Sequence, residues 1–275
     1  MPEGDAVWRT AARLNEALAG RPITEWELRW GELGASDKRG RTTIEVVPHG
    51  KHLLHRLDDG WTLHSHLRME GRWSVVERPK VTARNRRDPW IRALVGTAES
   101  VALGRQLGML DLVRTDREDA LVGHLGPDLL GSDWDAEEAL RRLRSHPDAE
   151  VGAALLDQTN LAGIGTMWAA EICFLEKVNP WIRVGSLDDA ALARVVARAH
   201  RLLNRTLKFK GSVSTGNWRD PLYIYGKPGR PCPRCAAPIR KASIGKAPTQ
   251  RELYYCAVCA PRPDSEPEKT RIPTA

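Results

Sequence analysis

The stretch CPRCAAPIRKASIGKAPTQRELYYCAVC, residues 232–259, decides the C-terminal part of the fold. Its cysteines form two C-x2-C pairs separated by 20 residues, and each pair can offer two sulfurs to one tetrahedral ion. A separation of about 15–20 residues suits a two-stranded ribbon, and the segment ELYYC supplies a strand into the second pair. We therefore predict one structural zinc ion in a zinc ribbon, with the ligands Cys232, Cys235, Cys256 and Cys259. A redox pair or incidental thiols remain the alternative.

The basic surplus of the chain lies in the same segment. Residues 226–262 hold eight Lys or Arg and one acid, a surplus as large as the net charge of +7 for all 275 residues. Concentrated positive charge of this kind indicates an acidic partner such as a nucleic-acid backbone. The fifth cysteine, Cys173, lies in an apolar helical pattern and is expected to be simply buried.

Composition excludes several classes of protein. A hydrophobic content of 41% with 28% charged residues is typical of a globular protein in water. No apolar run approaches the roughly 20 residues of a membrane span. The opening MPEGDAVWRT carries acids and lacks the apolar segment of a secretory signal. We expect a cytoplasmic monomer without a membrane partner.

Periodicity predicts an α+β, multidomain chain. Residues 5–18 have a helical apolar face, and residues 22–114 show short alternating runs that predict a β-sandwich or flattened barrel behind that leading helix. Between residues 136 and 209 the period is helical, with four candidate helices. The expected units are a β-sandwich domain, a hinge, a helical domain, a zinc finger and a disordered tail, at residues 1–114, 115–135, 136–225, 226–262 and 263–275.

The N-terminus offers a nucleophile. Once an aminopeptidase removes Met1, the secondary amine of Pro2 ionises well below a lysine, so a useful fraction is neutral near pH 7. Such an amine can attack a carbonyl-like carbon as Schiff-base lysines do, and a position at a helix start lowers its pKa further. Glu3 stands beside it and can move protons. Many chains begin Met-Pro, so the pattern alone does not establish this chemistry.

Two further motifs are ambiguous in isolation. Lys51 follows the turn at 48–50 and is expected on one face of its strand with Leu53, His55 and Leu57, where a solvated lysine is the ordinary interpretation. The segment 160–165, NLAGIG, joins two predicted helices and can aim backbone N–H groups at a phosphate. A plain turn between helices is the simpler interpretation.

Histidines gather in the same part of the chain. Five of the eight lie between residues 49 and 66. The pair His64-x-His66 can share a strand face and bind a metal ion. Packing and hydrogen bonding on a sheet that faces nucleic acid is the favoured interpretation.

These motifs occur together and in order, and the chain from residue 1 to about 262 closely resembles the formamidopyrimidine-DNA glycosylase / endonuclease VIII family. The quoted segments are PEG at 2–4, GKHLLHRL at 50–57, LLDQTNLAGIGTMWAAEI at 155–172, and YGKPGRPCPRC with RELYYCAVC at 225–259. The resemblance implies Pro2 as nucleophile, Glu3 as general acid/base and Lys51 as the catalytic lysine. It also implies a helix–two-turns–helix element and makes Arg251 the phosphate-binding arginine of the finger.

The resemblance extends to the gap that a flipped-out base leaves. HLRMEGRW at 66–73 puts Met69 at the wedge position, and GRQLGML at 104–110 puts Arg105 and Leu107 at its companions. Gly163 and Gly165 are implied as phosphate contacts through their backbone. Thr166 departs from the asparagine usual after this glycine turn and offers fewer hydrogen-bond donors.

The implied activity is a DNA glycosylase with AP lyase activity that removes oxidised bases from damaged double- or single-stranded DNA in a bacterial cell. The segment from Lys210 to Tyr223 is short and leaves little room for a long lesion-capping loop, which favours oxidised pyrimidines. An oxidised-purine glycosylase and a non-catalytic damaged-DNA-binding relative are the alternatives. A zinc-ribbon RNA-binding or transcription factor would explain only the C-terminus.

Overall fold

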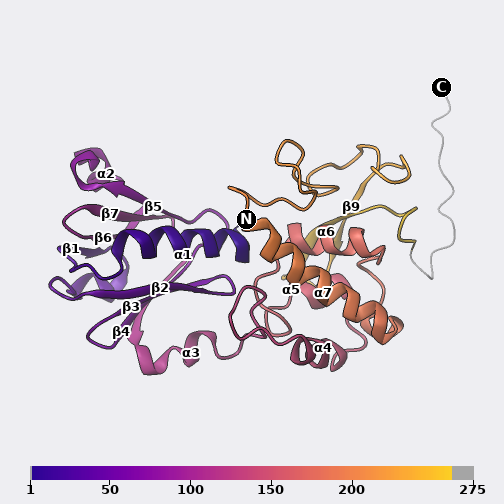
Figure 1. Cartoon of the computed structure of the whole chain (residues 1–275), viewed down its shortest axis with the longest axis horizontal. Helices are drawn as coiled ribbons and strands as arrows, with labels where there is room; N and C mark the ends of the chain where they lie inside the picture. The colour runs from indigo at the N-terminus through magenta and orange to yellow at the C-terminus, as the bar shows by residue number, and fades with distance from the viewer. Residues whose placement is uncertain (1, 262–275) are drawn as a thin grey trace.

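The computed structural model describes residues 2–261 and shows two halves joined near the N-terminus (Figure 1). The leading helix α1 (Gly4–Leu18) begins at the junction and runs along the β half. The tail expected at residues 263–275 lies outside the described residues. None of the helices between residues 2 and 261 has the length and hydropathy needed to cross a membrane.

The β half is a sandwich of two four-stranded antiparallel sheets, ordered β1-β6-β7-β5 and β2-β3-β4-β8. The strands are β1 (Glu25–Leu28), β2 (Thr43–His49), β3 (His52–Leu57), β4 (Trp61–His66), β5 (Arg72–Glu77), β6 (Ile91–Gly96), β7 (Ser100–Arg105) and β8 (Met109–Arg114). A short helix, α2 (Ala83–Arg87), lies between β5 and β6. Alternation along each strand sends one set of side chains into the core.

Helix α1 closes one side of this core through its apolar face. Val7, Ala11, Leu14 and Leu18 recur at helical spacing and are all buried in the cluster that also holds Leu53 and Leu57 of β3. Three of the four residues expected on one face of this strand are confirmed as buried together: Leu53, His55 and Leu57. Burial of one leucine of this kind contributes about 1.5–3 kcal/mol.

The segment expected to be a loose hinge contains ordered structure. After a 3-10 turn at 115–117 comes α3 (Asp119–Val122). Val122 and Leu125 pack with Leu54 of β3 and Ala162 of the helical half. A small apolar cluster with residues from both halves therefore holds the connection in place. The sequence pattern did not show this because the residues that pack together are far apart in the chain.

The helical half contains the four expected helices, at α4 (Ala136–Arg144), α5 (Val151–Leu156), α6 (Thr166–Glu176) and α7 (Asp189–Thr206). Asp135 and Asp188 cap α4 and α7 by accepting from backbone N–H groups. Helix α6 is buried along most of its length, with Trp168 fully enclosed. Cys173 on α6 is buried as expected, and burial raises the pKa of its thiol to about 12.

The zinc-ribbon segment shares the core of the helical half. Strands β9 (Arg240–Ile244) and β10 (Arg251–Tyr255) pair antiparallel, and Arg251 opposes Ile244. Ile244 and Leu253 are buried in the cluster that contains α5, α6 and α7. This packing fixes the ribbon, and with it β10, against α5 and α6.

Candidate active site

Glu3 is the central residue of the junction between the halves. Its buried carboxylate accepts hydrogen bonds from the backbone N–H groups of Gly165 (2.7 Å), Met167 (2.8 Å) and Trp168 (3.2 Å). These are free donors at the start of α6, which has no cap of its own from Gly165. A side chain from the first residues of the chain thus caps a helix of the other half.

Burial raises the pKa of Glu3 from 4.5 to about 7, and it outweighs the lowering by the Lys51 charge and by the three backbone N–H groups. A carboxyl group with this pKa is present in both protonation states near neutrality. That is the property a general acid/base needs at neutral pH. Pro2, the preceding residue, is only partly buried and precedes the first turn of α1.

Lys51 reaches the same junction from a two-residue turn. His49 opposes His52 in the β2–β3 pair, so Gly50 and Lys51 form the turn between them. Lys51 therefore lies just before β3 rather than within it, which corrects the expectation that placed it on the strand face. Gly50 has φ +57°, and a Cβ there would lie 2.8 Å from the Ala162 Cβ. Both its conformation and this close approach require glycine.

The Lys51 ammonium is mostly buried and donates to the Ile164 carbonyl in the glycine turn. Burial lowers its pKa, and the nearby Arg251 charge lowers it further, while Glu3 opposes the change. Lys51 therefore lies within electrostatic range of both Glu3 and Arg251. A lysine with a lowered pKa releases its proton more readily than a solvated one.

The backbone amides of the glycine turn are used inside the protein. Gly163 N–H donates to the Gln158 side-chain oxygen at 3.1 Å, and Gly165 N–H donates to Glu3. Both amides therefore already have acceptors within the protein, and their contact with a phosphate stays a prediction. Thr166 is buried at the first position of α6.

Two residues that were not singled out from the sequence hold the junction together. The buried Asp5 accepts from the Trp168 indole N–H (3.0 Å) and from the Ser212 hydroxyl (2.5 Å). Asp128 accepts from Gly50 N–H at 2.8 Å and so fixes the Lys51 turn. Their partners are 78 or more positions away in the sequence, so no local sequence pattern predicts these contacts.

Arg251 lies at the first position of β10, and its guanidinium donates to the carbonyls of Thr249 (2.9 Å) and Gln250 (2.8 Å). It lines a groove of about 990 Å³ between the ribbon and α5, together with Gln158. The side chain is exposed, so its charge is available to an anion in this groove.

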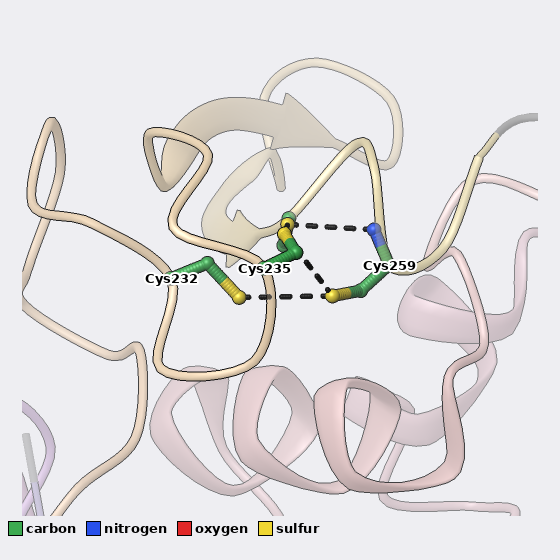
Figure 2. Close-up of side chains that lie close together, drawn as sticks. Cys232, Cys235 and Cys259 are labelled. Atoms are coloured by element: carbon green, nitrogen blue, oxygen red, sulfur yellow. Dashed lines mark hydrogen bonds between the residues drawn. The ribbon is translucent and has the colours of Figure 1, made fainter.

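The four cysteines of the ribbon converge on one point. Figure 2 shows three of them, Cys232, Cys235 and Cys259, with their sulfurs turned toward one another. Their sulfurs all lie within 4.8 Å of one another, and the Cys235–Cys259 and Cys232–Cys259 separations are 3.5 and 3.7 Å. Ligands about 2.3 Å from a tetrahedral ion stand about 3.8 Å apart, so this donor set fits a single metal ion. The ion would be enclosed by sulfur, which leaves it a structural role.

Two family models match this chain. The family model for the formamidopyrimidine-DNA glycosylase N-terminal domain matches residues 1–112, and the model for the formamidopyrimidine-DNA glycosylase H2TH domain matches residues 125–217. The chain belongs to the formamidopyrimidine-DNA glycosylase family. Similarity also extends over nearly the whole chain. A probable endonuclease 8 2 of Streptomyces coelicolor is 45% identical over 96% of both chains.

Other relatives and structures agree with this assignment. The DNA-(apurinic or apyrimidinic site) lyase Nei2 of Mycolicibacterium smegmatis is 37% identical over 94% of this chain and 98% of its own. The crystal structure of Lactococcus lactis Fpg in complex with N7-benzyl-Fapy-dG DNA is 24% identical, with a TM-score of 0.81. The similarity covers 95% of this chain and 100% of the Lactococcus lactis chain. The structural likeness shows the shared fold.

The three residues expected to fill the gap in DNA have different environments in this family member. Met69 is 65% exposed on the turn between β4 and β5. Arg105 is paired with Asp88. Leu107 is 3% exposed and packs in the sandwich core, and its place in the gap stays a prediction that requires this side chain to move. Gln106, with φ +50°, turns the chain at this point and bonds the Glu70 side chain next to Met69.

Proposed function

We propose that this protein is a bifunctional DNA glycosylase and AP lyase of base excision repair that removes oxidised bases. The observation that carries the proposal is the Glu3 carboxyl group, which is buried at the start of α6, adjacent in sequence to Pro2, and has a pKa of about 7. A protein that only binds DNA needs neither this proton carrier nor the buried Lys51 beside it.

The chemistry starts at the amine of Pro2 after Met1 has been removed. The neutral nitrogen attacks C1′ of the damaged nucleotide, and the base departs with the electrons of the glycosidic bond and a proton. Loss of the nitrogen proton and opening of the sugar give an iminium. Removal of a C2′ proton then expels the 3′ phosphate, and a second elimination expels the 5′ phosphate. Glu3 carries the protons, and Lys51 assists departure of the base.

Damaged DNA crosses the junction between the halves in this proposal. Lys51 and Arg251 bind phosphates around the lesion, while Met69 enters the stack where the nucleotide has rotated out. Gly163, Gly165 and Thr166 support this surface by shaping the turn that receives Lys51 and Glu3. Arg105 approaches the gap from β7 once its pairing with Asp88 is exchanged for the DNA.

We infer that the metal ion of the ribbon is zinc and that it is structural. The support is a set of four sulfur ligands at tetrahedral spacing, which suits zinc, and a core that the ribbon shares with the helices. The ion would hold β10 in place, and therefore Arg251. We further infer that the protein acts as a monomer in the bacterial cytoplasm, associated with the nucleoid through DNA.

Oxidised pyrimidines are the proposed preferred lesions. The relatives named endonuclease 8 support this branch, as does the short segment between Lys210 and Tyr223. Within it, Ser214 N–H and Thr215 N–H both donate to the Pro221 carbonyl, which closes the segment into a compact loop. The alternatives are preference for oxidised purines, which the formamidopyrimidine-DNA glycosylase relatives at about 30% identity represent, and binding without catalysis.

Borohydride trapping tests the proposed function. A 5-hydroxyuracil duplex incubated with the protein and borohydride should give a covalent adduct that maps to Pro2. Pro2→Gly should weaken trapping strongly, and a preparation that retains Met1 serves as the matched blocked control. Equal trapping in the blocked protein would refute Pro2 as the nucleophile. Faster cutting of an 8-oxoguanine duplex than of the 5-hydroxyuracil duplex would move the protein to the purine branch.

A further inference from the structure

One aspartate and two histidines form a hydrogen-bonded row across β8, β4 and β3, and a third histidine contacts the end of the row. Asp111 Oδ2 lies 2.8 Å from His64 Nδ1, and His64 Nε2 lies 2.8 Å from His52 Nδ1. The His52 ring also makes an edge contact with the His66 ring, at 4.8 Å between centroids. Both nitrogens of His64 are thus engaged within the protein, which excludes the metal site considered for His64 and His66.

The row fixes which nitrogens carry protons in the neutral state. The Asp111 carboxylate accepts from His64 Nδ1–H, so His64 Nε2 is the acceptor for His52 Nδ1–H. His52 Nε2 is then an unprotonated nitrogen, and it has no hydrogen-bond partner among residues 2–261. His66 Nδ1 accepts from Arg68 N–H at 2.9 Å, which leaves His66 Nε2 as its protonated nitrogen.

The position of the row connects it with the proposed DNA surface. His52 follows Lys51 directly and opposes His66 in the β3–β4 pair, and His66 lies three residues before Met69. His52 and His66 are both partly exposed, whereas His64 behind them is fully buried. The two accessible rings therefore lie between the lysine and the methionine that the proposed function assigns to DNA.

We propose that Asp111, His64 and His52 form a proton relay that lets a DNA phosphate bind at His52 with uptake of one proton. A proton enters at His52 Nε2, the His52 Nδ1 proton passes to His64 Nε2, and His64 becomes an imidazolium beside Asp111. His52 Nε2 has then changed from an acceptor into a donor, and together with His66 Nε2–H it offers two donors to one phosphate. The inference rests on the proposed function, because it needs DNA on this face.

The surroundings of the row keep His52 itself neutral before DNA binds. Burial lowers the pKa of His52 to about 3, and the neighbouring histidines lower it further. Burial, Arg68, His64 and Lys51 lower the pKa of His66 to about 4. The titratable and charged groups that face the row are His49, Lys51, His66, Arg68, Asp111 and His124. A phosphate bound between these groups raises the pKa of the row, because its negative charge favours the protonated form.

Binding measured against pH tests the relay without any catalytic step. The probe is a duplex that carries one tetrahydrofuran residue, which has no base to remove and no aldehyde. The parent protein is Glu3→Gln, which removes one group with a pKa near 7, while the Pro2 amine is the same in every protein compared and cancels in the differences. Calorimetry at pH 7 in buffers of different ionisation enthalpy counts the protons taken up, and fluorescence anisotropy gives Kd at pH 6, 7 and 8.

We expect uptake of about one proton in the parent and a Kd that weakens by at most about tenfold per pH unit, the limit for one linked proton. Asp111→Asn and His52→Phe should each reduce the uptake to less than half a proton, and His146→Gln, on the helical half, should leave it unchanged. At pH 8 the Kd of Asp111→Asn should lie within about twofold of the Kd of the parent. A substitution that merely disrupted the structure would weaken binding at every pH, including pH 8.

Two outcomes separate the relay from the function on which it rests. Equal proton uptake in all four proteins, or tight binding without uptake, would refute the relay and leave the glycosylase proposal intact. Failure of the wild-type chain to bind the probe or to be trapped by borohydride would instead refute the proposed function.

Discussion

Replacing Glu3 with glutamine should change how stability depends on pH. The wild-type carboxyl group has a pKa of about 7 in the folded protein and about 4.5 when it is exposed. The folded chain therefore binds the proton more tightly than the unfolded chain. Its favourable contribution is complete below pH 4.5 and is lost as the pH rises towards 7. Glutamine has no proton to lose, so the variant lacks this contribution at every pH.

The magnitude follows from the pKa difference. A shift of one pKa unit corresponds to about 1.4 kcal/mol, so the unfolding free energy of the wild type should fall by about 2–3 kcal/mol relative to Glu3→Gln between pH 5 and pH 8. For a protein of this size 1 kcal/mol corresponds to about 2–4 °C. The difference in Tm between the two proteins should therefore change by about 5–10 °C across this range.

Scanning calorimetry of both proteins at pH 5, 6, 7 and 8 measures this change. Taking the difference cancels the histidines, whose lowered pKa values act in the opposite direction in both proteins. A Tm difference that stays constant within about 2 °C would show that Glu3 is ionised throughout. The reasoning that makes it a proton carrier at neutral pH would then be wrong.

Four further substitutions test the junction, the ribbon and the proposed DNA surface. Gly165→Ala should abolish strand cutting in a gel assay while zinc content stays at one per chain, because its Cβ would lie 2.5 Å from the Glu3 side-chain carbon; wild-type cutting would contradict the packing. Arg251→Ala should weaken binding of a lesion duplex and reduce its salt dependence by about one unit of slope, with zinc retained. Cys256→Ala should lose the metal in an atomic-absorption assay and bind DNA as poorly as the Arg251 variant. Met69→Ala should slow base removal but preserve cutting of a duplex with a preformed abasic site, and an equal loss on both would argue against a wedge.

The helices and strands could be predicted because they depend on local pattern. The apolar spacing of Val7, Ala11 and Leu14 is enough to specify α1 and its buried face, and the alternation from Leu53 to Leu57 is enough for β3. The cysteine spacing is likewise enough to predict the metal site, since two C-x2-C pairs separated by the length of a two-stranded ribbon can bind one ion.

The contacts between the halves could not be predicted in this way. Nothing near Glu3 in the sequence shows that its carboxylate accepts from Gly165, because the two residues are 162 positions apart. The amides of the glycine turn were assigned to a phosphate for the same reason, since their internal acceptors were invisible. The burial of Leu107 was not foreseen because the left-handed conformation of Gln106 interrupts the alternation and directs the following side chain inwards.

The distance in sequence between Glu3 and its helix also sets an order of events during synthesis. A ribosome adds about 5–20 residues per second, so roughly 10–30 s separate the synthesis of Glu3 from the synthesis of residues 165–168, whose amides it accepts from. Throughout that interval the first residues have no partner at the junction, and a processing enzyme can reach Met1. Removal of Met1, which the proposed nucleophile Pro2 requires, can therefore precede the burial of Glu3, and the contacts made by Ser212 and Arg251 form later still.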